Sequence, residues 1–292
     1  MQGNLHMSDE SNSHILGVVE RLSKQYISNI ADLSTSELEQ PSRCHLWAVK
    51  DVVSHLVGIN GFVQNSLSRS LEGDGMPAEG MPNPGTGNAR SMSDGIANRA
   101  IQLSETALSS RTQMIDISER MEFELIETFR NVPSDKWDIP AYHPMNTLSP
   151  RLLLLLKLFE LSLHAWDIFN ALDKNHQVDS EAAELLLEVW KSPEINVWFF
   201  TPDIEQVDPI VLDVEFDSNK GLRLASWSGT LDIVDRPSTP SDSATVLKVS
   251  PELFSLLITA RANLDTNISA GNVSILGDES TIQWFHTWFK GS

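Results

Sequence analysis

Residues 152–169 read LLLLLKLFELSLHAWDIF, and only a few polar side chains, Lys157, Glu160 and His164 among them, interrupt the apolar run. A helix that is apolar on nearly every side is typical of a buried position, so we expect this segment at the centre of a helical core. Residues four apart share one helix face, which directs the Glu160 carboxylate and the His164 imidazole to the same place. Burying both groups is costly unless both are satisfied, and a cation would satisfy both.

A second histidine lies in a similar setting earlier in the chain. His55 is near the end of the stretch WAVKDVVSHL, residues 47–56. A ligand from this helix would complete a three-ligand site with open positions, the arrangement that a catalytic divalent ion needs. The pattern predicts a metal centre formed by His55, Glu160 and His164.

The same residues also admit a structural interpretation. Glu160 could pair with Lys157, three residues back on nearly the same helix face. Asp51 could cap its helix or orient His55 at the i,i+4 spacing. If the site holds a metal, Asp51 and Asp167 are instead candidate partners that would hold the imidazoles in one tautomer.

Two further residues are close enough in the sequence to join this site. Cys44 is the single cysteine, which excludes an internal disulfide. It lies three residues before Trp47, and a lone cysteine of this kind is more typical of a small core residue than of a reactive one. His143, in the connector 133–150, could reach the mouth of the metal site, although the sequence favours a solvent-exposed loop histidine.

These motifs carry a resemblance to a known family. The pattern W-x-V-x-D-V-V-x-H-L at 47–56, followed by E-x-x-x-H-x-W-D at 160–167, resembles the mycothiol-dependent maleylpyruvate isomerase family. Its members belong to the DinB-like metal-binding helical bundles. The resemblance implies a four-helix bundle that holds a divalent metal, usually zinc, through His55, Glu160 and His164. It also implies a low-molecular-weight thiol, mycothiol or an equivalent, as a cofactor.

The end of the chain is similar to the C-terminal sterol-carrier-like domain of that family. The segments LLITAR at 256–261 and VSILGD at 273–278 correspond to its Gly-Arg pair and to the later strand with Gly-Asp. Here Ala260 replaces the usual glycine, and Arg261 is retained. A guanidinium binds a carboxylate in a bidentate fashion, so Arg261 is our candidate catalytic residue, holding a substrate carboxylate. The alternative is a salt bridge to an acidic neighbour.

The composition restricts the partners of the chain. Among 292 residues, 40 are acidic and 21 basic, for a formal net charge of -19. This charge argues against nucleic acid or an anionic membrane surface as a partner. No uncharged apolar run is long enough to span a membrane, and residues 1–12 lack the apolar core of a signal peptide. We expect a cytoplasmic monomer or homodimer that acts on a small molecule.

The hydrophobic periodicity divides the chain into two parts. Helical rhythm predicts helices at 13–33, 49–71, 93–129 and 180–191, and another that carries the Glu160/His164 pair and ends near Asp173. Alternation and turn residues predict strands at 210–216, 222–227, 230–234, 244–249 and 272–276, with helices at 251–261 and 279–290. The fold class is therefore α+β multidomain. We expect a DinB-like four-helix bundle over 13–195 and a small α+β sterol-carrier-like domain over 205–292.

Within the loop from 73 to 91, the Gly- and Pro-rich residues 73–87 cannot form regular structure. The segment is either a disordered insertion or a loop over the mouth of the bundle. Loops of this length in compact domains are often functional or mobile, and we favour a lid over the metal site.

The predicted ligand set suggests a chemistry. Two neutral imidazoles and one carboxylate leave a divalent ion with a positive net charge and free coordination positions. Such an ion can favour the thiolate form of a bound thiol, polarise a carbonyl or activate water. We predict a metal- and thiol-dependent isomerase or transferase for a small anionic substrate. The alternatives are a metal-dependent hydrolase and a non-catalytic small-molecule or lipid-binding protein with a structural metal.

Overall fold

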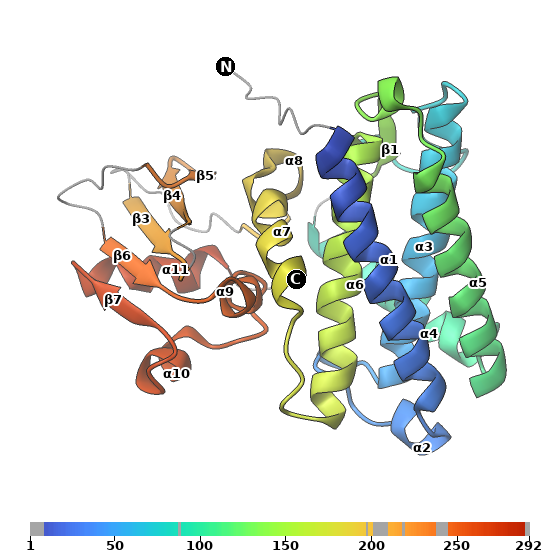
Figure 1. The fold of residues 1–292 in the computed structure, drawn as a ribbon, viewed down its shortest axis with the longest axis horizontal. Helices are drawn as coiled ribbons and strands as arrows, with labels where there is room; N and C mark the ends of the chain where they lie inside the picture. Colours follow the sequence, from blue (N-terminus) through green and yellow to red (C-terminus); the bar gives the residue numbers. More distant parts are fainter. Residues whose placement is uncertain are drawn as a thin grey trace. The chain divides into compact units, whose positions relative to one another are not determined.

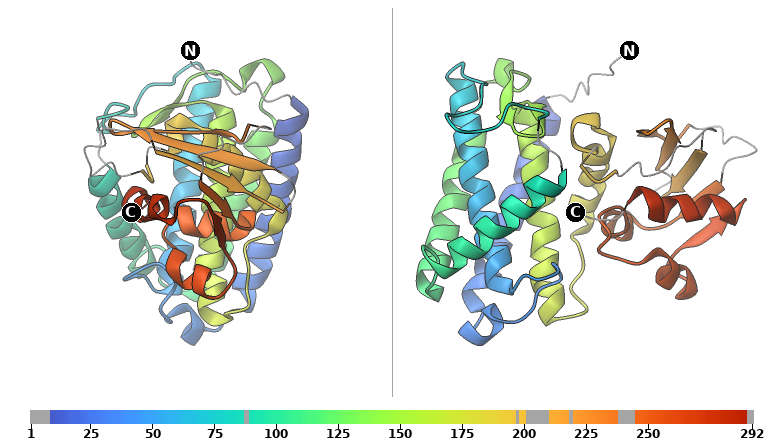
Figure 2. Two further views of the ribbon diagram at one scale, coloured as in Figure 1. Left: turned by 90° about the vertical axis from the view of Figure 1, so that its left-hand side faces the viewer. Right: turned by 180° about the vertical axis from the view of Figure 1, so that it is seen from behind.

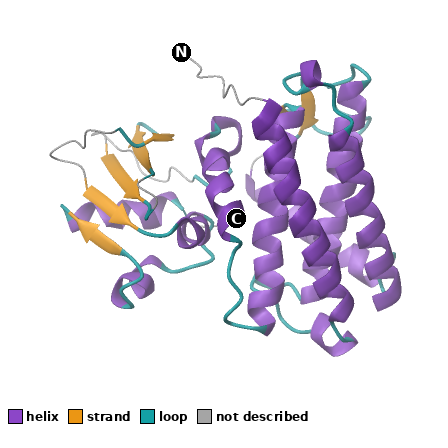
Figure 3. Cartoon of the chain, in the orientation of Figure 1, coloured by secondary structure: helices purple, strands orange, loops and turns teal. Residues whose placement is uncertain are grey.

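The structure is a computed structural model that describes residues 9–86, 89–196, 198–200, 210–217, 220–237 and 245–289. Contacts between residues divide the chain into two compact units, Met1–Ala182 and Ala183–Ser292. The first unit is helical and the second contains a sheet, which confirms the predicted α+β fold class (Figures 1 and 3). The predicted domain limits, 13–195 and 205–292, and the sterol-carrier-like character of the second unit remain predictions.

Four long helices form the first unit, and they lie side by side in Figures 1 and 2. They are α1 (Asp9–Asp32), α3 (Val49–Leu71), α5 (Arg111–Arg130) and α6 (Pro150–Leu172). Helix α6 contains the leucine-rich run and is buried along most of its length, as predicted. Its start is well defined, because the Ser149 side chain accepts a hydrogen bond from the Leu152 N–H and Pro150 occupies the first turn. In the described part of the chain, no helix is long and apolar enough to cross a membrane.

The single helix predicted for 93–129 is wrong, because the chain forms two helices there. Helix α4 (Ala89–Glu105) packs against α3 and runs obliquely to the long helices (Figure 2), and α5 begins at Arg111. The break follows from a cap on each side. The Leu108 N–H bonds back to the Leu103 carbonyl, and the Ser110 hydroxyl accepts from the Gln113 N–H.

A short helix, α2 (Thr35–Leu38), lies in the connector between α1 and α3. The Ser34 hydroxyl accepts from the Glu37 N–H, and the Glu37 carboxylate accepts from the Ser34 N–H. This reciprocal capping box explains why a single helical turn forms in a polar connector.

The connector 133–150 contains a short 3-10 turn, η1 (Ser134–Lys136), and a β-hairpin. Strands β1 (Ala141–His143) and β2 (Asn146–Leu148) pair antiparallel. Helix α3 anchors this hairpin, because the Ser66 hydroxyl donates to the Tyr142 carbonyl at 2.5 Å and the Ser70 hydroxyl donates to the Pro140 carbonyl at 2.7 Å.

The Gly- and Pro-rich segment after α3 lies against this hairpin. The Tyr142 hydroxyl donates to the Pro82 carbonyl, and the Gly85 N–H donates to the Pro144 carbonyl. At position 75 a Cβ would lie 2.6 Å from the Pro140 carbonyl oxygen, so only glycine fits. The described residues of this segment are therefore tied to the hairpin, and their role as a lid remains a prediction.

The second unit contains a five-stranded sheet of order β5-β4-β3-β6-β7. The strands are β3 (Ile210–Glu215), β4 (Gly221–Trp227), β5 (Thr230–Asp235), β6 (Thr245–Lys248) and β7 (Ser274–Leu276). Strands β3 and β6 pair parallel, and the other neighbours pair antiparallel. The helices of this part of the chain are α7 (Ser180–Lys191), α8 (Pro193–Asn196), α9 (Pro251–Ile258), α10 (Leu264–Ser269) and α11 (Ile282–Trp288), with a 3-10 turn, η2 (Glu279–Thr281), before α11. All five predicted strands are present.

Helix α9 ends three residues before the predicted limit at 261. The Ala260 N–H bonds to the Leu257 carbonyl, and the Arg261 N–H bonds to the Leu256 carbonyl at 2.7 Å. This pair of bonds is a Schellman motif, which places the residue after the cap in the left-handed region. Ala260 has φ +55°, a conformation that glycine adopts at lower cost.

Candidate metal centre

The three predicted ligands meet inside the helical unit. The Nε2 atom of His55 lies 3.0 Å from Oε2 of Glu160, and Nε2 of His164 lies 3.2 Å from the same oxygen. The two imidazole rings are 4.6 Å apart between centroids, in an edge-on arrangement. One donor atom from each of the three residues lies within 4.8 Å of the others. At this spacing, all three residues can bind a single ion.

Helices α3 and α6 place these ligands. Glu160 and His164 lie one turn apart on α6, and His55 faces them from the second turn of α3. The start of α3 is fixed by Asp51, whose carboxylate accepts from the Ala48 N–H at 2.9 Å and from the Ser104 hydroxyl at 2.5 Å. Asp51 therefore caps α3, and its predicted role in orienting His55 remains a prediction.

The three side chains are largely removed from solvent, with exposed fractions of 7% for His55 and 12% for both Glu160 and His164. Burial opposes ionisation of Glu160, but hydrogen bonds from His164 and His55 lower the pKa of its carboxyl well below the usual range. Burial likewise disfavours a charged His164, but hydrogen bonds with Asp167, Cys44 and Glu160 raise the pKa of its imidazole well above the usual range. The donor set of two imidazoles and one carboxylate fits a zinc-type ion.

Asp167 fixes the orientation of His164. Its side chain is fully buried, and its Oδ2 atom lies 2.8 Å from Nδ1 of His164. The ring nitrogen that faces Asp167 holds a proton, which directs Nε2 toward Glu160. This geometry agrees with the role predicted for Asp167.

Cys44 belongs to the same cluster. Its thiol donates to Oδ2 of Asp167 at 3.1 Å and lies 3.7 Å from Nδ1 of His164. The side chain is only half-buried. The interpretation of Cys44 as a small core residue therefore misses its contact with the polar residues behind the ligands.

The pairing of Glu160 with Lys157 is not what the structure contains. The Lys157 ammonium binds the Glu122 carboxylate at 2.6 Å and the Asn60 side-chain carbonyl at 2.8 Å. Glu160 instead faces the two histidines. The predicted Glu160–Lys157 pair is therefore wrong, and Lys157 pairs with Glu122 instead.

His143 is buried, so its interpretation as an exposed loop residue is wrong. It lies in β1 with 8% of its surface exposed, and its ring packs edge-on against Phe62 at 5.4 Å between centroids. Burial lowers the pKa of its imidazole to about 4, and the charge of Glu160 acts in the opposite direction. The Met145 N–H donates to Nδ1, which leaves the hydrogen of the neutral ring on Nε2. His143 is thus a neutral histidine within electrostatic range of Glu160.

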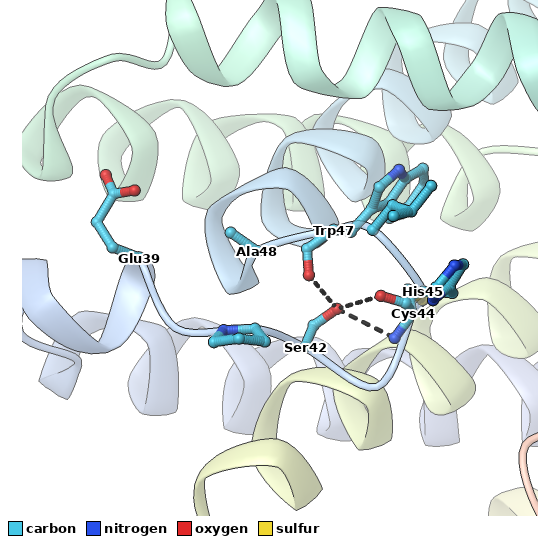
Figure 4. A pocket seen from close by; sticks show the side chains of 8 residues that line it. Glu39, Ser42, Cys44, His45, Trp47 and Ala48 are labelled. Carbon is cyan, nitrogen blue, oxygen red and sulfur yellow. Dashed lines mark hydrogen bonds between the residues drawn. The ribbon is translucent and has the colours of Figure 1, made fainter.

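A pocket of about 370 Å³ lies beside Cys44, in the loop between α2 and α3 (Figure 4). It is lined by Glu39, Pro41, Ser42, Cys44, His45, Leu46, Trp47 and Ala48. The Ser42 hydroxyl shapes the loop by accepting from the Cys44 N–H at 3.1 Å and donating to the Trp47 carbonyl at 2.9 Å. The Trp47 ring lies 5.2 Å from the His55 ring between centroids. The pocket wall is therefore continuous with the residues around the candidate ligands.

Comparison with known proteins assigns the chain to a family. The family described as "Mycothiol maleylpyruvate isomerase N-terminal domain" matches residues 19–169, which is more than half of the chain and includes all three candidate ligands. The chain belongs to this family. The mycothiol maleylpyruvate isomerase family was the one expected from the two sequence motifs, so that expectation is confirmed.

Solved structures agree with the family in fold. A mutant of the mycothiol-dependent maleylpyruvate isomerase is 13% identical and superposes with a TM-score of 0.58, over 90% of this chain and 92% of that one. Another crystal structure of the mycothiol-dependent maleylpyruvate isomerase is 12% identical, with a TM-score of 0.57 and the same coverage. At these identities the likeness shows the fold. No functionally curated protein matches the sequence.

Arg261, the candidate catalytic residue, belongs to the second unit. Its backbone closes the cap of α9, and the residue is half-buried. The family assignment covers residues 19–169, so the role of Arg261 remains a prediction.

Proposed function

We propose that this member of the mycothiol maleylpyruvate isomerase family is a metal-dependent enzyme that uses a low-molecular-weight thiol. The proposed reaction is isomerisation, or thiol transfer, on a small anionic substrate. The observation that carries the proposal is the convergence of His55, Glu160 and His164, whose donor atoms lie within 4.8 Å of one another. Membership in the family supports the thiol and the isomerase class.

The residues around the ligands prepare them for a cation. Asp167 contacts the far nitrogen of His164, so the near nitrogen is directed toward the position that a cation would take. Glu160 stays ionised although it is buried, because two imidazoles contact its carboxylate. When bound, a divalent ion such as zinc would supply Lewis acidity and favour the thiolate form of the thiol.

The proposed isomerisation proceeds through a transient thiol adduct. The thiolate sulfur forms a bond to one carbon of a conjugated double bond, and the π electrons move onto the conjugated carbonyl oxygen. The former double bond then rotates as a single bond. Return of the electron pair restores the double bond and expels the thiolate, so that atoms and electrons balance with no oxidant or reductant.

Arg261 is the proposed carboxylate-binding residue. A planar guanidinium holds a carboxylate through two parallel hydrogen bonds, which suits a dicarboxylic substrate. With 40 acidic and 21 basic residues, the net negative charge of the chain does not attract an anion, so a specific cationic side chain is needed to bind one.

The proposal is tested by assaying cis–trans isomerisation of a conjugated dicarboxylic acid by the purified protein. The assay is run with and without mycothiol, before and after removal of divalent metal by a chelator and its replacement with zinc. We expect turnover only when both thiol and metal are present. Hydrolysis of an ester or amide without thiol would favour the hydrolase alternative. Thermal stabilisation by lipids but not by thiols would favour the non-catalytic binding protein.

A further inference from the structure

A buried polar network joins the four long helices next to the candidate metal centre. The Lys157 ammonium on α6 donates to Oε1 of Glu122 on α5 at 2.6 Å and to Oδ1 of Asn60 on α3 at 2.8 Å. The Asn60 amide donates to the same Glu122 oxygen at 2.8 Å, and the Ser23 hydroxyl on α1 donates to the other at 2.7 Å. Exposed fractions are 0% for Lys157, 2% for Glu122, 1% for Asn60 and 3% for Ser23.

Fold stability alone does not account for this network. Moving a lysine and a glutamate out of water carries a desolvation cost that their mutual attraction often only offsets, and well-packed apolar residues of similar volume are frequently neutral or more stabilising. The best-attested use of such buried polar groups is to fix the register of packed helices. We therefore ask which pair of helices this network holds in register.

That register is the one between the two ligand-bearing helices. Lys157 precedes Glu160 by three residues on α6, and Asn60 follows His55 by five residues on α3. The Lys157–Asn60 hydrogen bond is a direct link between these helices, close to the ligands on both. The apolar side chains of α6 are less directional, because leucine recurs on nearly every side of its first turns.

A small error in this register would matter for a metal. Each residue advances an α-helix by about 1.5 Å, whereas bonds between ligands and metal tolerate departures of about 0.2 Å. Van der Waals packing of leucines permits small shifts at little cost, but a hydrogen bond does not. A directional link beside the ligands therefore confines their separation more tightly than packing does.

We propose that Lys157, Glu122 and Asn60 are positioning residues that set the register of α3 against α6, and thereby the metal-binding geometry of His55, Glu160 and His164. This inference rests on the proposed metal centre. It assigns a role to a charged pair that lies outside the set of candidate ligands.

The test uses the full chain loaded with Co²⁺, whose visible absorption reports coordination geometry. In Lys157→Met/Glu122→Leu both charges are replaced by apolar side chains of similar size. We expect a folded protein with a lower melting temperature, because the buried Asn60 amide and Ser23 hydroxyl lose their partners, together with Co²⁺ affinity about tenfold weaker and an altered visible spectrum. In Asn60→Leu the ion pair is kept and only the link to α3 is lost. We expect its Co²⁺ affinity to be about threefold weaker than that of the unaltered protein.

Two controls separate positioning from general effects. Leu67→Ala creates a cavity at a fully buried site on α3 and leaves the network intact. It should lower the melting temperature while leaving the Co²⁺ affinity within about twofold. Glu20→Gln/Arg130→Gln removes a surface ion pair between α1 and α5, and it should change neither quantity appreciably.

The outcomes distinguish the inference from the function on which it rests. If the unaltered protein binds no Co²⁺, the metal centre is overturned, and the positioning role with it. If it binds Co²⁺ and both network variants match it in affinity and spectrum, the network is merely structural and the metal centre stands. If the double variant does not fold, Asn60→Leu decides. Equal loss of affinity in Leu67→Ala would attribute the effect to stability and overturn the inference.

Discussion

The Oδ2 atom of Asp167 lies 2.8 Å from Nδ1 of His164, while the other nitrogen of that ring lies 3.2 Å from Glu160. The Asp167 carboxylate thus orients the imidazole through Nδ1. The Glu160 carboxylate faces Nε2, where a cation would bind. Asp167 is fully buried and also accepts a hydrogen bond from Cys44. The orientation of His164 is therefore fixed by the fold before any ion arrives.

Replacing Asp167 with asparagine should weaken metal binding without unfolding the bundle. Asparagine keeps the shape of the side chain but is a weaker hydrogen-bond acceptor. His164 therefore loses its fixed tautomer and becomes a poorer metal ligand. We expect zinc affinity to fall about 10–100-fold, measured by equilibrium dialysis, with unchanged helical circular dichroism. Asp173→Asn, at the end of the same helix, is the control and should bind as the unaltered protein does. Equal affinities for the two variants would remove Asp167 from the site.

His143 should make the metal-free protein less stable in mild acid. Burial lowers its folded-state pKa to about 4, against about 6.5 in the unfolded chain. The contribution to stability is complete above pH 6.5. It declines as the pH falls toward 4, because the unfolded chain takes up the proton first. The loss should approach about 3 kcal/mol.

Urea unfolding between pH 7.5 and pH 4 measures this contribution. His143→Gln should unfold with a shallower dependence on pH over that window, whatever its absolute stability. Parallel curves for the two proteins would show that His143 is not held neutral by the fold.

Ala260→Gly should stabilise the C-terminal unit. Ala260 adopts φ +55° at the cap of α9, and glycine reaches this conformation without steric cost. The expected gain in unfolding free energy is about 1 kcal/mol, measured by thermal or urea unfolding. Ala262→Gly is a matched control for which no such gain is expected. If the variant is no more stable than the unaltered protein, Ala260 adopts its positive φ without a measurable energetic cost.

Arg261→Lys and Arg261→Ala should both retain the metal and lose most turnover of an anionic substrate. Lysine keeps the charge but lacks the planar, bidentate guanidinium. Steady-state kinetics with mycothiol and a dicarboxylic substrate, together with metal analysis of each variant, measure the effect. Lys248→Ala, which removes a surface cation of the same unit, should remain active. Normal turnover in Arg261→Ala would indicate that the second unit is an independent ligand carrier.

Much of the helical unit could be predicted from local pattern. Helix α6 follows from its leucine run, and the shared direction of Glu160 and His164 follows from their spacing on one helix. That His55 would face them could not come from periodicity, because the contact joins distant parts of the chain. The residue types made His55 a candidate third ligand, the resemblance to a family placed it with the other two, and the two helices meet as it implied.

The errors arose where tertiary contacts outweigh local sequence. The strands around His143 have three residues each, too few for an alternating pattern, and side chains of α3 hold them in place. Lys157 is well spaced to pair with Glu160, but Glu122 on another helix binds it instead. The break between α4 and α5 did leave a local signal, the capping residue Ser110, within a helix-permissive stretch.

Metal content measured on the unaltered protein and on His164→Ala tests the central claim most directly. Each is dialysed against zinc and analysed for metal per chain, and circular dichroism is recorded on the same samples. We predict one ion per chain for the unaltered protein and none for His164→Ala. Helical content should be retained in both, because the leucine-rich core stabilises the bundle. An unaltered protein that takes up no zinc, nickel or manganese, or a His164→Ala variant that still binds one ion per chain, would contradict the account.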